Sequence, residues 1–447
     1  MFKRVLVANR GEIAVRIIRA LHELNIEAVA IYSEGDENSL HTQIADYAIR
    51  IGPAFSKDSY LNIKSIISAA EVSGADAIHP GYGFLAENEE FAKIVEECGF
   101  KFIGPSPESI KLMGDKIEAK RVMKEAGVPV IPGTEEAISN IKEGLKFAKE
   151  VGFPVIIKAA AGGGGKGMRI VRNEEDFEKQ FKIAQIEAEK AFGDNRVYIE
   201  KFLEKPRHIE VQVLGDSYGN VIHLFERECS IQRRHQKLIE EAPSPALDEE
   251  IRKKLTEAAV KGAKAIKYQN AGTMEFLYSD GKFYFMEMNT RIQVEHPVTE
   301  EITHIDIVKQ QILIAAGERL SIKQKEINKI GHAIEIRINA EDPEKNFRPS
   351  PGKIEVLHLP GGPGIRIDTH IYQGYVIPPY YDSLIAKMIA WGRTREEAIK
   401  RLNRAINETL IKPIKTTLSL HKKIINNRRF IEGELHTKFL EEMGIGD

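Results

Sequence analysis

The sequence predicts a multidomain protein of the α/β and α+β classes, and three observations lead to this fold class. Short apolar segments alternate with helical ones over residues 1–113, which is typical of a mainly parallel sheet. A run of four glycines separates two apolar segments near residue 160. From Gly331 onward the chain is rich in predicted strands, and a helical segment follows at 395–410, which indicates a small α+β domain.

The composition excludes several classes of function. The chain has 447 residues, enough for two to four structural units, and it is 42% hydrophobic and 29% charged, as globular proteins are. Its net charge of −2 gives no electrostatic basis for binding nucleic acid or an anionic membrane. No apolar run approaches the roughly 20 residues of a membrane span. The two cysteines, Cys98 and Cys229, do not indicate a disulfide scaffold, so we expect a reducing, cytoplasmic location.

The first 113 residues are expected to form a Rossmann-like domain with a parallel sheet. Its predicted strands and helices are, in order, Lys3–Ala8, Ile13–Leu24, Glu27–Tyr32, Ala75–His79, Asn88–Cys98 and Phe102–Ile103. The segment from Gly81 to Ala86 also fits the dinucleotide fingerprint G-x-G-x-x-A. However, three glutamates crowd the start of the next helix, where a pyrophosphate needs positive charge: Glu87, Glu89 and Glu90. We therefore favour a structural role for this segment.

The glycine run lies between the apolar strand Pro154–Lys158 and a second strand that begins after Lys166. Four consecutive glycines cost much backbone entropy, so such a loop is rarely without a role; they are Gly162, Gly163, Gly164 and Gly165. Their N–H groups can close on phosphate oxygens. The loop is not a Walker A motif, because Lys166 is followed by glycine and the context is strand–loop–strand. The alternative is an ordinary flexible hairpin tip.

Residues 273–289 are expected to form a β-hairpin that carries acidic and amide side chains. Asp280-Gly281 between two apolar runs is a strong hairpin signal. Glu287 and Asn289 are two apart and share a face of the second strand. Glu275 joins that face if the turn has three residues, whereas a two-residue turn puts it on the opposite face. We predict the three-residue turn and a site for Mg²⁺ or Mn²⁺; the alternative is a solvated acidic face.

A loop of charged residues follows the hairpin and reads Asn289-Thr-Arg291-Ile-Gln-Val-Glu295-His-Pro297. The hairpin and this loop resemble those of the biotin carboxylases, a branch of the ATP-grasp ligases. The resemblance runs from Asn9-Arg-Gly-Glu-Ile-Ala to Pro378-Pro-Tyr-Tyr-Asp-Ser383, so it covers nearly the whole chain. One departure is Lys166, where many relatives have arginine; the charge is kept, but the forked guanidinium geometry is not.

The resemblance implies three domains. Residues 1–113 would form the N-terminal biotin carboxylase domain, and residues 114–317 the ATP-grasp domain. Within the latter, residues from about 130 to 203 would form a mobile lid. Residues 331–441 would form the C-terminal biotin carboxylase domain.

The resemblance also implies which residues bind the nucleotide and the metal. Lys116, Lys158 and the glycine loop with Lys166 would hold the phosphates. Seven further residues would lie near the nucleotide: Glu200, Lys201, Leu203, His208, Gln232, His235 and Leu277. Two ions, Mg²⁺ or Mn²⁺, would be held by Glu275, Glu287 and Asn289.

The implied reaction converts ATP, bicarbonate and biotin into ADP, phosphate and N-carboxybiotin through carboxyphosphate. Glu295 is the expected base for bicarbonate. Lys237 and Arg291 would hold bicarbonate, and Arg291 would also keep Glu295 ionised. Arg337 would stabilise the negative charge on biotin when its ureido nitrogen loses a proton.

The resemblance implies a homodimer that works with a separate biotin carboxyl carrier protein and carboxyltransferase subunits. The family attaches biotin in a Met-Lys-Met setting, which is absent here, and no sequence remains for a carrier after the C-terminal domain. Acetyl-CoA carboxylase and split pyruvate carboxylase use similar subunits, so the final acceptor stays open. Two alternatives are another ATP-grasp ligase that makes an acyl phosphate and a non-catalytic subunit of the same fold. The intact Glu275, Glu287 and Glu295 argue against the second.

Overall fold

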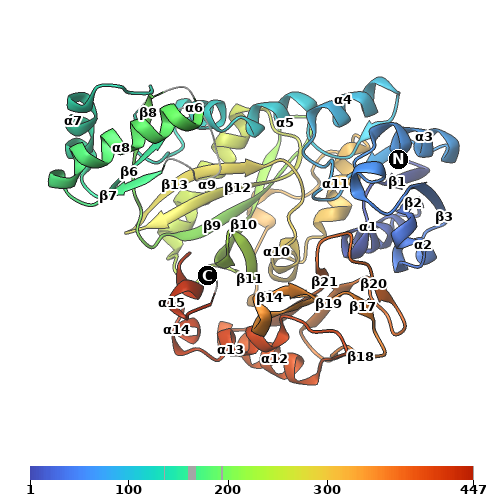
Figure 1. Cartoon of the computed structure of the whole chain (residues 1–447). Coiled ribbons are helices and arrows are strands. Elements are labelled where there is room, and N and C mark those ends of the chain that lie inside the picture. Colours follow the sequence, from blue (N-terminus) through green and yellow to red (C-terminus); the bar gives the residue numbers. More distant parts are fainter. Residues whose placement is uncertain (135, 160–167, 193–194, 446–447) are drawn as a thin grey trace. The chain divides into compact units, whose positions relative to one another are not determined.

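The computed structural model describes residues 1–134, 136–159, 168–192 and 195–445 (Figure 1). The chain divides into two compact units. The first comprises Met1–Val128, Arg207–Leu277 and Glu287–Asp447, and the second comprises Pro129–Pro206 and Tyr278–Met286. The second unit therefore contains the segment that the sequence assigns to the lid. Among the described residues, no helix has the length and apolar character needed to cross a membrane.

The N-terminal part of the first unit is a parallel sheet in the order β3-β2-β1-β4-β5. Its strands are β1 (Arg4–Val7), β2 (Glu27–Ser33), β3 (Tyr47–Gly52), β4 (Ala77–His79) and β5 (Lys101–Phe102). Val5 and Val7 pack in one buried cluster and Leu6 in another, because successive side chains of β1 point to opposite faces. Apolar residues of α1 (Gly11–Glu23) join the first cluster, and those of α3 (Ile63–Ser73) and α4 (Glu89–Glu97) join the second. A sheet buried on both faces confirms the predicted Rossmann-like domain.

The segment with the dinucleotide-like spacing is a loop that the protein itself holds in place. Asn9 Nδ2 donates hydrogen bonds to the carbonyl oxygens of Pro80 and Tyr82, at 2.8 and 2.7 Å. A Cβ at Gly81 would lie 3.0 Å from that nitrogen, so the close approach requires glycine. The next helix, α4, begins only at Glu89. The loop therefore does not open directly into a helix, as a dinucleotide site requires.

An eight-stranded sheet, in the order β13-β12-β9-β10-β11-β14-β21-β19, forms most of the remaining core. Its strands are β9 (Arg207–Gly215), β10 (Val221–Arg233), β11 (Gln236–Ala242), β12 (Asn270–Ser279), β13 (Lys282–Asn289), β14 (His332–Asn339), β19 (Ile365–Thr369) and β21 (Leu384–Gly392). β11 pairs antiparallel with β14, and β14 with β21. Strands from the expected ATP-grasp and C-terminal domains thus share one sheet.

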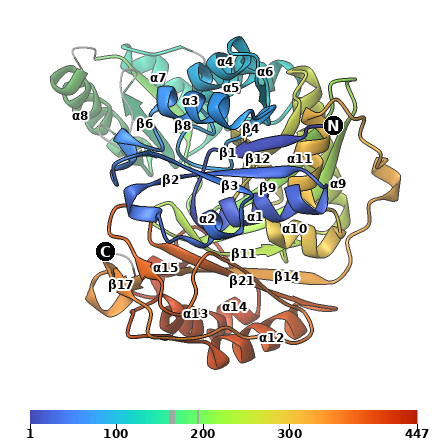
Figure 2. The same ribbon diagram turned by 90° about the vertical axis from the view of Figure 1, so that its right-hand side faces the viewer.

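The two faces of β11, β14 and β21 are covered by different helices (Figure 2). On one face lies α10 (His296–Thr303), whose Val298 and Ile302 pack against Ala242, Ala333 and Ile389. On the other face lie α12 (Arg395–Glu408) and α13 (Leu418–Ile425), which pack against the isoleucines of β14. The face under α10 also carries the charged residues of the site.

The other helices of the first unit are α2 (Leu40–Ile44), α5 (Pro107–Gly114), α6 (Lys116–Glu125), α9 (Glu249–Ala265), α11 (Ile307–Ala315), α14 (Arg428–Ile431) and α15 (Phe439–Glu442). Its short strands form three two-stranded sheets: β15 (Glu341–Asp342) with β16 (Arg348–Pro349), β17 (Gly352–Lys353) with β20 (Val376–Ile377), and β18 (Val356–His358) with β22 (Leu410–Lys412).

The second unit is built on the antiparallel sheet β7-β6-β8. Its elements are α7 (Ile141–Val151), β6 (Val155–Ala159), β7 (Arg169–Val171), α8 (Glu174–Phe192) and β8 (Val197–Lys201). Phe177 and Phe181 of α8 pack on Val155 and Ile157 of β6. The strands on both sides of the glycine run are confirmed. Gly162–Gly165 and Lys166 themselves lie outside the described residues.

Candidate active site

The hairpin β12–β13 has a two-residue turn, so the predicted three-residue turn is wrong. Asp280 and Gly281 both have positive φ, 51° and 75°, as in the type I′ turns that join twisted strands. A regular ladder from this turn would put Glu275 and Asn289 on opposite faces. Asn289 Nδ2 nevertheless donates to Glu275 Oε1 at 2.8 Å. We infer that the ladder contains a bulge, which returns the two side chains to one face.

Glu287 lies on the same face of β13 as Asn289, because the buried Met288 between them points the other way. The contact between Glu275 and Asn289 agrees with the predicted arrangement, and a shared site of Glu275, Glu287 and Asn289 stays a prediction. These residues offer two carboxylates and an amide oxygen, the donors that Mg²⁺ and Mn²⁺ prefer. The donor set thus fits a divalent metal.

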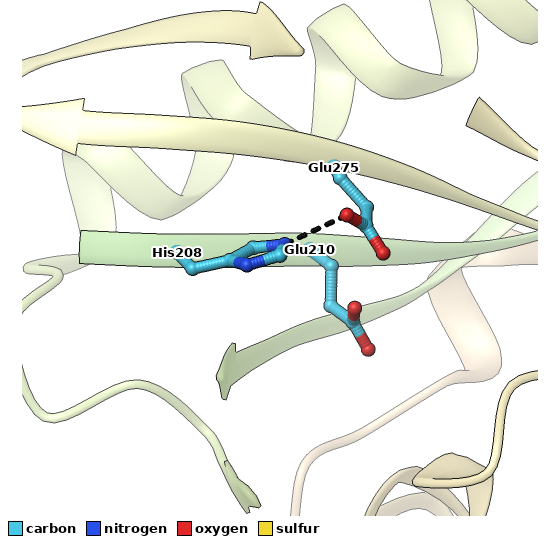
Figure 3. A group of neighbouring side chains, drawn as sticks. All are labelled: His208, Glu210 and Glu275. Carbon is cyan, nitrogen blue, oxygen red and sulfur yellow. Dashed lines mark ion pairs between the residues drawn. The ribbon is translucent and has the colours of Figure 1, made fainter. Parts of the chain in front are cut away.

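Lys237 lies at the centre of the site and is surrounded by three carboxylates. Its Nζ is 2.5 Å from Glu210, 2.9 Å from Glu275 and 2.6 Å from Glu295. His208 and Glu210 project from β9 toward Glu275 of β12, and His208 Nε2 is 2.8 Å from Glu275 Oε2 (Figure 3). Although burial opposes it, the charges of Lys237 and its neighbours hold the pKa of Glu275 far below its usual range.

Glu210 and Arg227 are members of the site that are not among the residues predicted from the sequence. Both side chains are completely buried, and Arg227 donates to Glu210. Its other nitrogens donate to Gln212 at 2.8 Å, Thr299 at 2.9 Å and Thr273 at 3.1 Å, so each nitrogen of the guanidinium donates at least one hydrogen bond. A signal was present in β9, where polar residues alternate with apolar ones; the polar residues are His208, Glu210 and Gln212.

Glu295 is an ionised carboxylate that lies just before α10 and is completely buried. Its two oxygens accept hydrogen bonds from Lys237 at 2.6 Å and from Arg337 Nη2 at 2.9 Å. Burial raises its pKa, but the nearby charges of Lys237, Arg337 and Arg227 outweigh burial and hold the pKa well below its usual value. The carboxylate can therefore accept a proton.

Arg291 is not the residue that keeps Glu295 ionised, which corrects the expectation from the sequence. Its guanidinium instead donates to Glu87 at 2.8 Å, Gln293 at 2.9 Å and Asn289 at 3.1 Å. Glu87 also accepts from the backbone N–H of Thr290 at 2.9 Å. Arg291 thus lies beside the proposed metal ligands, fixed by a glutamate of the N-terminal domain.

Four predicted site residues of the first unit remain, and two of them lie beside residues of the site described above. Lys116 begins α6, is exposed, and lies 3.3 Å from Glu287. Gln232 Nε2 is 3.4 Å from His208 Nδ1, so it lies beside the central cluster. His235 is exposed in the turn between β10 and β11, and Leu277 is half-buried on β12.

Four predicted nucleotide residues belong to the second unit. Lys158 of β6 forms an ion pair with Glu200 of the neighbouring strand β8. Lys201 Nζ donates to the carbonyl oxygens of Gly152 and Phe153 at 2.8 and 3.1 Å. Leu203 is half-buried just after β8. A lysine with a carboxylate partner on its own sheet is held in a defined position, as a phosphate ligand must be.

Models of three protein families match the chain in succession. They are the biotin carboxylase N-terminal domain over residues 1–110, the ATP binding domain of the carbamoyl-phosphate synthase L chain over 115–323, and the biotin carboxylase C-terminal domain over 335–442. Biotin carboxylase 1 of Bacillus subtilis is 58% identical over 443 residues, which are 99% of this chain and 98% of that relative. The A subunit of pyruvate carboxylase from Methanothermobacter thermautotrophicus is 57% identical over 442 residues, 99% of this chain and 90% of that relative.

A solved structure is also similar. It is the biotin carboxylase domain dimer of the 2-oxoglutarate carboxylase from Hydrogenobacter thermophilus, in complex with MgADP, ADP and bicarbonate. The two chains share 54% identity at a TM-score of 0.88, over 99% of this chain and 98% of that one.

The ATP-binding domain and the acidic site define an ATP-dependent ligase. The chain belongs to the biotin carboxylase family, as the matches at both ends and the full-length relatives show. The predicted family, fold class and activity, an ATP-dependent carboxylation of biotin, are thereby confirmed.

Proposed function

We propose that Glu295, Lys237, Arg291 and Arg337 carry out the carboxylation, and that the biotin is borne by a separate carrier protein. The observation that supports this most is the position of Glu295, an ionised and buried carboxylate between Lys237 and Arg337. A base for bicarbonate has to be held in position before its pKa matters. Both of its neighbours are cations that can also attract an anionic substrate.

In the first step, bicarbonate is held by Lys237 and Arg291. Its hydroxyl proton passes to Glu295, and the resulting oxygen attacks the γ-phosphorus of ATP. The bond from that phosphorus to the β,γ-bridging oxygen breaks, ADP leaves, and carboxyphosphate forms. Lys116, Lys158 and the glycine loop hold the phosphates in line, because positioning and charge stabilisation account for most of the catalysis of phosphoryl transfer.

In the second step, carboxyphosphate gives up its carboxyl group to the ureido nitrogen of biotin and releases phosphate. The proton of that nitrogen passes to the released phosphate, and negative charge develops on the ureido oxygen. Arg337 lies beside Glu295 and stabilises this charge. Mg²⁺ or Mn²⁺ would be held by Glu275, Glu287 and Asn289, and would neutralise the phosphate charge when bound.

Glu295→Gln tests the assignment of the base. This change keeps the shape of the side chain and removes its charge, so bicarbonate-dependent ATP cleavage should fall on the order of 10²-fold or more. ATP binding, measured by calorimetry, should stay within a few-fold of the parent. Glu301→Gln is a matched control, because Glu301 lies on α10 but pairs with Arg366 at 3.4 Å; it should keep the parent's rate. An E295Q enzyme within a few-fold of the parent would show that another group is the base.

The carrier and the remaining partners are proposed from the sequence and the relatives. The chain has no Met-Lys-Met triplet in which biotin would be attached. A relative of almost the same length is named as one subunit of a pyruvate carboxylase, which indicates a multisubunit enzyme. We therefore assign this chain a separate carrier protein, carboxyltransferase subunits and a homodimeric state. Because Cys98 and Cys229 are both free thiols, we also assign it a cytoplasmic location.

Co-expression with a biotin ligase tests the carrier assignment. A streptavidin blot of the purified chain should be blank, while added carrier protein should gain carboxyl groups from labelled bicarbonate. A band at the mass of this chain would contradict the proposal.

A further inference from the structure

A pair of buried carboxylates lies directly beside Arg337, and the mechanism above does not use it. Glu240 of β11 and Glu335 of β14 are partners in the antiparallel ladder, so their side chains leave the sheet on the same face. Both are completely buried. That face is the one under α10, because Ala242 and Ala333 of the same strands pack against this helix.

Three of the four carboxylate oxygens of this pair accept no hydrogen bond from any described residue. Glu240 Oε1 accepts from Arg337 Nε at 2.6 Å, whereas Glu240 Oε2 and both oxygens of Glu335 are buried without a partner. A buried oxygen without a donor is costly, and two neighbouring carboxylates cannot both stay ionised away from water. One proton on the pair removes one charge and supplies the missing donor.

Each described cation near the pair is already bound to other acceptors, so none is free to compensate a second negative charge on the pair. Lys237 of β11 is shared among three other carboxylates, and Arg337 is shared with Glu295. From β21, Lys387 acts on Glu335, but it lies 3.1 Å from Glu12 and donates to the carbonyl oxygen of Val294.

At the start of α10, His296 is buried, and burial together with Lys387 and the nearby arginines holds its pKa well below the usual value, so it is neutral. Burial raises the pKa of Glu240 to about 7 and the pKa of Glu335 well above its usual value, in agreement with the geometry.

We propose that Glu335 is a positioning residue for Arg337: it shares one proton with Glu240, and this leaves Arg337 a positive charge to offer to biotin. The inference rests on the role of Arg337 given under the proposed function. With both carboxylates ionised, Arg337 would lie among three negative charges, including Glu295, and its attraction for the negative ureido oxygen would be cancelled. The shared proton keeps one of the three carboxyl groups neutral.

The test compares the rate of biotin-stimulated ATP cleavage from about pH 6 to about pH 9 in the parent and in Glu335→Gln. In the parent, the pair loses its proton as the pH rises, so biotin stimulation should fall about tenfold per pH unit above the apparent pKa of the pair. In E335Q the amide cannot ionise, so this alkaline decline should be absent. The readout is the slope of the decline, which a merely structural role of Glu335 would not change.

Glu228→Gln is the matched control. Glu228 is also buried with a raised pKa, caused by burial, but it accepts from Ser244 at 2.7 Å and lies 3.3 Å from Arg207, not beside Arg337. E228Q should keep the alkaline decline of the parent. An unchanged decline in E335Q would overturn the proposal. A parent that shows no bicarbonate-dependent ATP cleavage would instead refute the proposed function.

Infrared spectroscopy of the parent protein provides a second test, which can be carried out even if E335Q does not fold. The parent should show the carbonyl stretch of a protonated carboxyl group at neutral pH, and this band should disappear over the same pH range as biotin stimulation. In a folded E335Q the band should be missing or shifted. A parent spectrum without such a band at neutral pH would overturn the proposal.

Discussion

Single residues in this site act through shared charges rather than through isolated pairs. Lys237 joins Glu210, Glu275 and Glu295, and Arg337 joins Glu240 and Glu295. Breaking one buried ion pair leaves its partner charged and without compensation, which costs more than the pair contributes. The cluster is therefore expected to hold its geometry before substrates bind. A substrate that binds to Lys237 or Arg337 must replace some of the contacts that these side chains make with the protein.

A buried pair outside the catalytic cluster allows this energetic argument to be tested. Glu241 accepts from Arg395 at 2.6 and 3.1 Å, and His332 Nε2 lies 2.6 Å from it. Burial raises its pKa, but Arg395 and His332 outweigh burial and lower the pKa to about 2 from 4.5. Because the folded pKa is the lower one, the stabilisation is complete above pH 4.5 and is lost as the pH falls toward about 2.

Glu241→Gln should therefore lower the free energy of unfolding by about 3 kcal/mol at neutral pH. The difference from the parent should shrink as the pH approaches 3, where the native carboxylate begins to gain its proton. Urea unfolding at several pH values measures this difference. An equal loss at neutral and acidic pH would show that the ion pair does not account for the effect.

Residues that are close in sequence could be assigned from their spacing, whereas residues joined only by the sheet could be assigned only where the family resemblance named them, as for Lys237 and Arg337. Glu275, Glu287 and Asn289 belong to one hairpin, and Glu295 follows within a short loop. Arg227 and Glu335, in contrast, join the site through strand pairing and burial. A fully buried charged residue is rare, and sequence alone gives no reason to place one inside a sheet.

At the scale of elements, the hairpin β12–β13 shows how a turn and a site can impose different requirements. Asp280-Gly281 favours a two-residue turn, since both residues accept positive φ. The proposed metal site requires Glu275 and Asn289 on one face, and a hydrogen bond joins their side chains. The inferred bulge satisfies both requirements, but bulges have no clear sequence signal, so a longer turn is the arrangement that the sequence predicts for bringing the ligands together.

Gly281→Ala tests the turn. A Cβ at this position would meet no atom within 4 Å, so any loss of stability comes from the φ of +75° alone. Alanine in this conformation should cost about 1 kcal/mol, seen as a lower urea midpoint. Gly281→Asn is the control, because asparagine tolerates positive φ and should lose clearly less. Equal stability of G281A and the parent would mean that the turn adopts another conformation in solution.

At the scale of the whole molecule, the eight-stranded sheet joins segments that the sequence divides into domains. β11 and β14 are separated by the helices α9, α10 and α11, yet their ladder pairs Glu240 with Glu335. The N-terminal parallel sheet was predictable because its strand–helix alternation is local. The pairing of β11 with β14 depends on long-range burial, which periodicity cannot reveal. Arg337 reaches Glu295 only because of this pairing.

The division into two units leads to a prediction about nucleotide binding. Chain connections between the units lie at four places, after residues 128, 206, 277 and 286. The second unit carries Lys158 and Lys201, which are expected to meet the nucleotide, while Glu275 and Glu287 in the first unit are expected to meet its metal. A nucleotide that binds to the second unit should protect exposed backbone amides of that unit.

Amide hydrogen exchange should therefore slow in the second unit, around β6 and β8, when MgATP is added. Mg²⁺ without nucleotide should have little effect. Glu287→Gln, with one proposed metal ligand neutralised, should need a higher MgATP concentration for the same protection, while the exchange of the N-terminal sheet stays unchanged. Protection of β6 and β8 that is equal with MgATP and with magnesium-free ATP, in both proteins, would show that the metal ligands of the hairpin do not take part in nucleotide binding.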